Sequence, residues 1–323
     1  MSDQEPGFNW AEYRASLQVS EDDLSWSDAE DLGRLSVSTF LNEHSGVRRD
    51  RSVGTLRLVG DGVEGHSAPL DAVGSVLKNF QRLVLATGLS AGGFKSIQGR
   101  LPVDIVSKIR LLLDGVPTPG SLVLSMVPAT LPQAEILPDG QTEITPPEES
   151  QAVDRAVRDA FDLLESARAV GADLDSSELV TKLLQAGPRV ASTLKDFADT
   201  LVNADFEAEM TWRQPRQKRS RVSLSRAELV NLGKAIKARQ LAKEPVTLVG
   251  VLRTVSDLSA LKVDVPDVAV VNVGTAGISR DVITSLKVGM RVSIKAEVVE
   301  ETVPAGDPKL IYQAQSISEI SPE

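Results

Sequence analysis

Residues 279–299 read SRDVITSLKVGMRVSIKAEVV, and this stretch contains three structural signals in succession. Ser279 is a helix N-cap residue in front of a short helix over residues 280–286. Gly289 then favours a tight turn, and the alternation of residues 291–299 predicts a strand. A short helix that leads through a tight turn into a long strand therefore lies near the middle of the C-terminal region.

Strand patterns flank this stretch on both sides. Four segments rich in β-branched residues predict strands over residues 246–255, 263–265, 268–273 and 310–320. Five strands with a short helix between the third and the fourth resemble the OB-fold barrel in topology, and residues 286–292 resemble its helix-to-strand corner. The resemblance covers about residues 245–322, so we expect an all-β, OB-like barrel over residues 244–323. No family is recognised for residues 1–244.

Antiparallel hairpins are predicted in the body that precedes the barrel, residues 51–243. Residues 55–59 alternate like a strand. A Pro/Gly loop joins a first pair of strand patterns and a run of basic residues joins a second pair, namely 105–113 with 121–127 and 206–212 with 221–224. The proline-rich interval 128–149 is expected to be an exposed loop or a linker between two domains.

A cluster of helices completes the α+β body that the sequence predicts. Apolar residues recur three or four positions apart between Leu70 and Val84, which predicts a helix ended by Gly88. The same periodicity predicts helices over residues 153–167, 179–186, 190–197 and 226–241. Ser225 and Glu228 have the capping-box spacing in front of the last of these helices.

The N-terminal residues 1–50 are expected to be an acidic and largely disordered tail. Nine acidic residues and one arginine give residues 1–31 a net charge of −8, within a chain whose total is −10. Trp10, Tyr13 and Trp26 lie in this polar segment, where a solvated spacer has little use for large aromatic side chains. We interpret these three residues as contacts to a protein partner or, alternatively, to the protein's own folded part.

Composition excludes several kinds of site. The chain of 323 residues contains no cysteine and two histidines, so disulfides, thiolate metal sites and three-histidine metal sites are impossible. The N-terminus lacks the basic start and apolar core of a secretory signal, and no stretch has the roughly 18 apolar residues that span a bilayer. We expect a cytoplasmic protein without membrane contact, bound metal or cofactor.

Three glycine-containing motifs match known site patterns but lie in the wrong context. Residues 60–65 fit G-x-G-x-x-G, yet the following helix begins too late to bind a pyrophosphate. Residues 88–92 fit G-x-S-x-G, but a helix precedes Ser90 where a nucleophile elbow needs a strand. Phe94 interrupts a near match to Walker A, in which lysine must follow glycine directly. We assign no catalytic residue and expect a protein that is not an enzyme, with an unfamiliar carboxylate site as the remaining alternative.

A basic segment stands out in this acidic chain. Residues 211–243 hold ten basic residues and one glutamate, a net charge of +9. On a protruding hairpin and the helix after it, these cations are candidates for contact with phosphates or with an acidic protein surface, and the indole of one tryptophan is a candidate for stacking on a base. The candidate residues are Trp212, Arg213, Arg216, Lys218, Arg219, Arg221, Arg226, Lys234 and Lys237.

Two functions are consistent with these features. The first is a non-enzymatic binding or regulatory subunit that acts through protein–protein contacts, because residues 245–323 have a net charge of −3 and one aromatic residue, Tyr312. The alternative is a nucleic-acid-binding protein that uses the basic arm 213–226 to contact DNA or RNA. In that case the acidic tail would be an internal competitor for the arm, a hypothesis based on complementary charge. A solvated arm without a partner is a third interpretation of the same residues.

Overall fold

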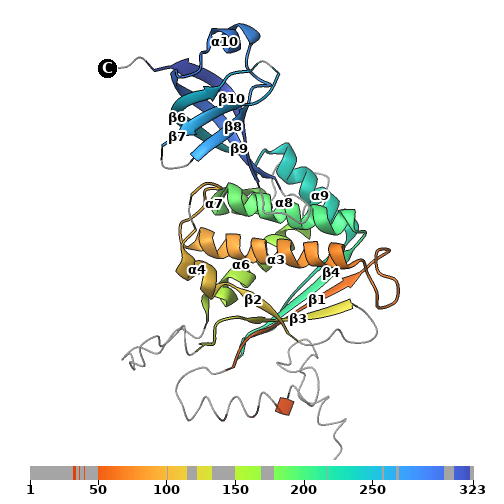
Figure 1. Cartoon of the computed structure of the whole chain (residues 1–323). Helices are drawn as coiled ribbons and strands as arrows, with labels where there is room; N and C mark the ends of the chain where they lie inside the picture. Colours follow the sequence, from red (N-terminus) through yellow and green to blue (C-terminus); the bar gives the residue numbers. More distant parts are fainter. Residues whose placement is uncertain are drawn as a thin grey trace, which may run out of the picture.

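The computed structural model shows an N-terminal α+β region followed by a C-terminal β-barrel (Figure 1). Buried apolar side chains form two separate clusters, one in each region. The predicted fold class, an α+β body followed by a β-barrel, is confirmed. The residues that the structure describes are 50–99, 101–114, 122–132, 150–168, 178–215, 217–256, 258–266, 269–301 and 309–320, with the single residues 32, 33, 36 and 40.

A five-stranded antiparallel sheet underlies the N-terminal region. Its strands are β1 (Val53–Val59), β2 (Leu111–Asp114), β3 (Leu122–Pro128), β4 (Glu207–Arg213) and β5 (Ser220–Leu224). They lie in the order β2-β3-β1-β4-β5, so both predicted hairpins are present as the pairs β2–β3 and β4–β5. Alternate side chains are buried on one face, among them Leu56 and Leu58 of β1 and Met210 of β4.

Helices cover one face of this sheet (Figure 1). They are α3 (Leu70–Ala91), α4 (Val103–Lys108), α6 (Ala152–Arg168), α7 (Glu178–Ala186), α8 (Pro188–Asn203) and α9 (Arg226–Ala238). α3 and α8 pack together where the ring centroids of Phe80 and Phe197 lie 5.7 Å apart. Apolar side chains of α3, α6 and α8 fill the space between the helices and the sheet, which explains the helical periodicity of the sequence.

Two predictions for this region are wrong in detail. Gly88 does not end the first helix, which continues to Ala91. A Cβ at Gly88 would overlap Cδ1 of Ile109, so the glycine allows close packing within the last turn of α3. Residues 105–108 belong to α4 and not to a strand. The four-residue spacing of Ile105 and Ile109 places both side chains against the core on one side of a helical turn.

The C-terminal region is a closed barrel of five strands. Its elements are β6 (Glu244–Thr254), β7 (Leu261–Val265), β8 (Ala269–Gly274), α10 (Arg280–Ser285), β9 (Arg291–Glu301) and β10 (Lys309–Glu319). The strands follow the order β10-β8-β7-β6-β9, and β9 pairs with β10 to close the ring. The pairing of β8 with β10 is parallel and the other pairings are antiparallel. The five strands and the short helix that the sequence predicts here are confirmed.

The stretch from Ser279 onward forms the corner between α10 and β9. Gly289 has a φ of +93°, a conformation that residues with a Cβ rarely adopt. Its N–H donates to the carbonyl oxygen of Leu252 at 2.8 Å, and the N–H of Leu252 donates to the carbonyl oxygen of Met290 at 2.9 Å. The glycine turn therefore positions the start of β9 beside β6.

Some predictions concern residues outside the described part of the chain. They include the tail residues Trp10, Tyr13 and Trp26, the basic residue Arg216, and residues 133–149 of the proline-rich interval. Among the residues that are described, no helix has both the length and the apolar character needed to cross a bilayer.

Candidate functional site

Trp212 is buried in the core and is not available to a ligand. Its side chain is 2% exposed, and its indole Nε1 donates to Oδ1 of Asp154 at 3.0 Å. The burial follows from the alternation of side chains along β4, because every second residue of this strand faces the helices. The expectation that Trp212 stacks on a nucleic-acid base is therefore wrong.

The described cations of the basic arm 213–226 already have interaction partners. Arg221 lies 4.0 Å from a carboxylate oxygen of Glu209, which also pairs with Arg57 at 3.0 Å. Arg226 forms an ion pair with Asp205. Other cations of the segment also have partners, namely Arg213, Lys218 and Arg219. The charge of the described part of the arm is therefore partly neutralised within the protein, which the sequence alone does not indicate.

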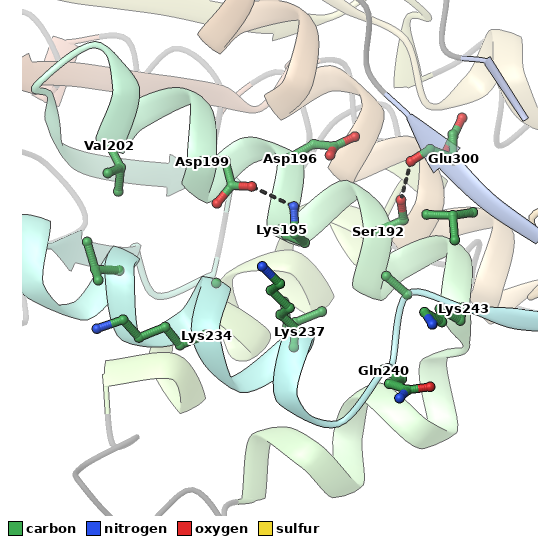
Figure 2. Close-up of a pocket in the computed structure, with 15 residues that line it drawn as sticks. Ser192, Lys195, Asp196, Asp199, Val202, Lys234, Lys237, Gln240, Lys243 and Glu300 are labelled. Carbon is green, nitrogen blue, oxygen red and sulfur yellow. Dashed lines mark hydrogen bonds and ion pairs between the residues drawn. The ribbon is translucent and has the colours of Figure 1, made fainter. Parts of the chain in front are cut away.

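A groove opens where the helical layer meets the barrel, and we call it the junction groove (Figure 2). Its volume is about 480 Å³, within the range of ligand pockets. α8 forms one wall, α9 and the turn after it form the second, and the end of β9 forms the third. The lining consists of Ser192, Lys195, Asp196, Asp199, Val202, Val230, Gly233, Lys234, Ile236, Lys237, Gln240, Ala242, Lys243, Val299 and Glu300.

The sequence of α9 brings this helix close to α8 and directs two lysines outward. Gly233 faces Asp199, and a Cβ on this glycine would lie 3.1 Å from Oδ1 of the carboxylate. Lys234 and Lys237 are exposed on the side of α9 away from its buried stripe. That stripe consists of Leu229, Leu232, Ala235 and Ile236.

The predicted capping box fixes the first turn of α9. Oγ of Ser225 accepts from the N–H of Glu228 at 3.5 Å, and the Glu228 carboxylate accepts from the N–H of Ser225 at 2.7 Å. Burial raises the pKa of Glu228. The hydrogen bonds that the N–H and the hydroxyl of Ser225 donate to its carboxylate, together with the charge of Arg168, outweigh burial and lower the pKa below its ordinary value. The box sets where α9 begins and thereby where its lysines lie.

Two lysines of the junction groove lack a carboxylate partner among the described residues. Nζ of Lys195 lies 2.6 Å from Asp199, and Nζ of Lys243 lies 2.8 Å from a carboxylate of β9. No described carboxylate lies within ion-pair distance of Lys234 or Lys237. Like charges three residues apart on a helix repel each other. An anion bound near Lys234 and Lys237 reduces this repulsion and therefore stabilises the helix. The groove therefore suits a negatively charged ligand.

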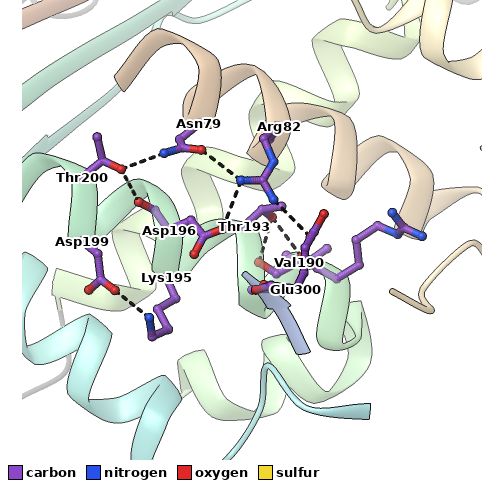
Figure 3. A network of polar contacts seen from close by, with 11 residues as sticks. Asn79, Arg82, Val190, Thr193, Lys195, Asp196, Asp199, Thr200 and Glu300 are labelled. Carbon is purple, nitrogen blue, oxygen red and sulfur yellow. Dashed lines mark hydrogen bonds and ion pairs between the residues drawn. The ribbon is translucent and has the colours of Figure 1, made fainter. Parts of the chain in front are cut away.

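Arg82 of α3 pairs with two carboxylates of the groove without itself belonging to the lining (Figure 3). Nη1 of Arg82 lies 3.1 Å from Asp196, and Nη2 lies 3.1 Å from Glu300. Asn79 accepts from Nη1 at 3.0 Å and donates to Oγ1 of Thr200 at 2.7 Å. The charged side chains of this network are 12–14% exposed, so water screens their attraction only in part. The network joins α3, α8 and β9.

A second polar contact joins the barrel to the helical layer. Oε2 of Glu244, at the start of β6, accepts from the N–H of Ile97 at 2.7 Å. Arg189 of α8 donates to the carbonyl oxygens of Ser96 and Ile97 at 2.7 and 3.0 Å. Burial lowers the pKa of Arg189, while the charges of Glu300 and Glu244 oppose this shift. Ionic and hydrogen-bonded contacts therefore hold the junction beside the groove.

The structure divides the predicted site residues between two places. Lys234 and Lys237 line the junction groove, whereas the described cations of the hairpin do not. Sequence reasoning missed Arg82, Lys195 and Glu300, because α3, α8 and β9 come together only in the folded chain. One local signal does indicate part of this site: Lys195 and Asp199 lie four residues apart on α8, the spacing of an ion pair on one helix face.

The groove combines ammonium groups, carboxylates held in ion pairs and apolar side chains. Among the described residues, no group of three or more histidine, cysteine or acidic side chains is placed to hold a metal ion. In comparisons with known proteins, no family model, no curated protein and no solved structure matches this chain.

Proposed function

We propose that this chain is a non-enzymatic binding protein whose junction groove accepts an acidic segment of a partner protein. The observation that carries the proposal is the pair Lys234 and Lys237, which line the groove and have no carboxylate partner among the described residues. Lysine is a point charge on a flexible stem, so it binds carboxylates without a fixed geometry. This property suits a peptide segment whose acidic side chains are themselves mobile before binding.

The apolar part of the lining supports a protein partner over a nucleic acid. A peptide that carries both carboxylates and apolar side chains contacts both kinds of surface in the groove. Grooves for single-stranded nucleic acids combine cations with aromatic side chains on which bases stack, and the described lining contains no aromatic residue. The apolar lining residues are Val202, Val230, Ile236, Ala242 and Val299.

We also propose that the barrel is an OB-fold that contacts protein. The strand order, the parallel pairing of β8 with β10 and the position of α10 between β8 and β9 support this assignment. Tyr312, the one aromatic residue of the barrel sequence, is 5% exposed. A barrel without an exposed tyrosine and with a net charge of −3 over residues 245–323 suits a protein surface better than a polyanion.

Fluorescence anisotropy with defined probes tests the proposal on the full chain. The acidic probe is a fluorescein-labelled peptide with the repeat Glu-Glu-Leu, and the competing probes are single- and double-stranded DNA and RNA oligonucleotides. The double variant Lys234→Glu/Lys237→Glu reverses the unpaired charges of the groove. The control Lys262→Glu/Lys287→Glu makes the same change in net charge at two exposed barrel lysines outside the groove.

We expect the acidic peptide to bind to the wild-type chain. The groove variant is expected to weaken this binding about tenfold, because each surface ion pair contributes up to about 1 kcal/mol. The control is expected to leave the affinity unchanged. Absence of peptide binding, or equal loss in both variants, would contradict the proposal. Oligonucleotide binding in preference to the peptide, abolished by Lys218→Ala/Arg219→Ala/Arg221→Ala, would support the nucleic-acid alternative in its place.

A further inference from the structure

We infer that Arg82 sets the charge selectivity of the junction groove and makes it a site for acidic ligands. The inference rests on the proposed function and adds to it the residue that determines which ligand charge is accepted. Three carboxylates belong to the lining, and together they would disfavour an acidic ligand. Asp199 is paired with Lys195 within the groove, and the other two, Asp196 and Glu300, are paired with Arg82.

One guanidinium reaches both carboxylates because Arg82 lies between α8 and the end of β9 (Figure 3). Each of its terminal nitrogens lies 3.1 Å from one carboxylate, Asp196 or Glu300. Asn79 accepts a hydrogen bond from the same guanidinium and donates one to Thr200, and these two contacts hold the guanidinium in place. Arg82 does not belong to the lining, so it acts on a ligand through the two carboxylates and is a positioning residue.

The two carboxylates and the lysines line the same groove, with Asp196 and Glu300 across from Lys237 (Figure 2). If Arg82 were absent, both carboxylates would repel an acidic ligand. They would also attract the ammonium groups that the ligand needs. Partial burial strengthens both effects, because a charge that is little exposed to water is weakly screened.

A merely structural role for Arg82 makes a different prediction. The residue also connects α3 to the barrel, so its loss is expected to reduce stability in either case. Loss of stability alone would weaken acidic and basic ligands alike. Loss of selectivity would weaken the acidic ligand and strengthen the basic one, and only the second pattern supports the inference.

Anisotropy titrations of the full chain with a Glu-Glu-Leu repeat peptide and a Lys-Lys-Leu repeat peptide separate these patterns. Arg82→Met is expected to weaken the acidic peptide about tenfold and to strengthen the basic peptide. Adding Asp196→Asn and Glu300→Gln to Arg82→Met removes the two carboxylate charges that Arg82 paired in the wild type, and it is expected to restore binding of the acidic peptide. Arg57→Met, which removes an exposed arginine from an ion pair on the sheet, is the control and leaves both affinities unchanged.

The outcomes also separate this inference from the proposed function. If the wild-type chain does not bind the acidic peptide, the proposed function fails and the inference fails with it. If the wild-type chain binds and Arg82→Met keeps both affinities, the inference alone is overturned. Should Arg82→Met not fold, Asp196→Asn/Glu300→Gln with Arg82 retained is expected to strengthen the acidic peptide severalfold, and an unchanged affinity would overturn the inference.

Discussion

Replacement of Asp154 by alanine is expected to destabilise the N-terminal region strongly, because this carboxylate is fully buried. Its Oδ1 accepts from Oγ of Ser52 and from Nε1 of Trp212, and its Oδ2 accepts from the N–H of Gln151 at 3.0 Å. These donors belong to the residue in front of β1, to β4 and to the residue in front of α6. One side chain therefore holds three elements of the body together.

The magnitude follows from the number of buried donors that lose their acceptor. A hydrogen bond to a charged group contributes about 1.5–3 kcal/mol, and the variant also removes the cost of burying the carboxylate. We expect the free energy of unfolding to fall by about 3 kcal/mol, a large part of the 5–15 kcal/mol typical of a folded domain. With a urea m value of about 2–3 kcal/mol/M, the unfolding midpoint shifts down by about 1 M.

Urea titration followed by far-UV circular dichroism measures this shift. The helical signal reports mainly on the N-terminal region. Within the described part of the barrel the one helix is α10, which has 6 residues. Asp162→Ala changes an exposed aspartate of the same helix and is expected to stay within about 0.5 kcal/mol of the wild type. A shift below about 0.3 M for Asp154→Ala would refute the reasoning about its three hydrogen bonds.

Three further changes test other parts of the fold in the same titration. Gly62→Ala places a Cβ against the carbonyl oxygen of Ala204 and is expected to cost about 2 kcal/mol, and a neutral result would contradict that close approach. Gly74→Ala, in the exposed second turn of α3 with nothing within 4 Å of the added Cβ, is expected to stabilise by about 0.5–1 kcal/mol, and a loss would contradict the open site. Glu228→Gln is expected to cost about 1 kcal/mol at neutral pH. Because the pKa of Glu228 is lowered in the folded state, its contribution to stability is present above the ordinary pKa of 4.5 and is lost as the pH falls through the folded-state pKa. A difference in stability between variant and wild type that stays constant into acid would argue against the capping role.

The elements that were predicted correctly are those with local signals. Alternating β-branched residues identified β9, and the spacing of Ser225 and Glu228 identified the start of α9. Gly289 marked a turn because its positive φ is an intrinsic property of glycine. Such features depend on residues a few positions apart, so their physical causes can be read in the chain itself.

The predictions that failed depend on contacts between distant residues. Gly88 reads as a helix end, but its close contact with Ile109 gives it a place inside α3. Trp212 reads as an exposed stacking residue of a basic arm, but the buried Asp154, far away in sequence, is its partner. The junction groove could not be predicted, because Arg82 and Glu300 meet only when the barrel lies against the helices.

The most direct test of the central claim is a map of where an acidic peptide touches the full chain. Carbodiimide cross-linking joins carboxylates to lysine amines without a spacer, and mass spectrometry then identifies the lysines. We predict that a Glu-Glu-Leu repeat peptide becomes joined to Lys234 and Lys237 of the junction groove. Cross-links concentrated at Lys218, or spread evenly over exposed barrel lysines such as Lys262 and Lys287, would contradict the account.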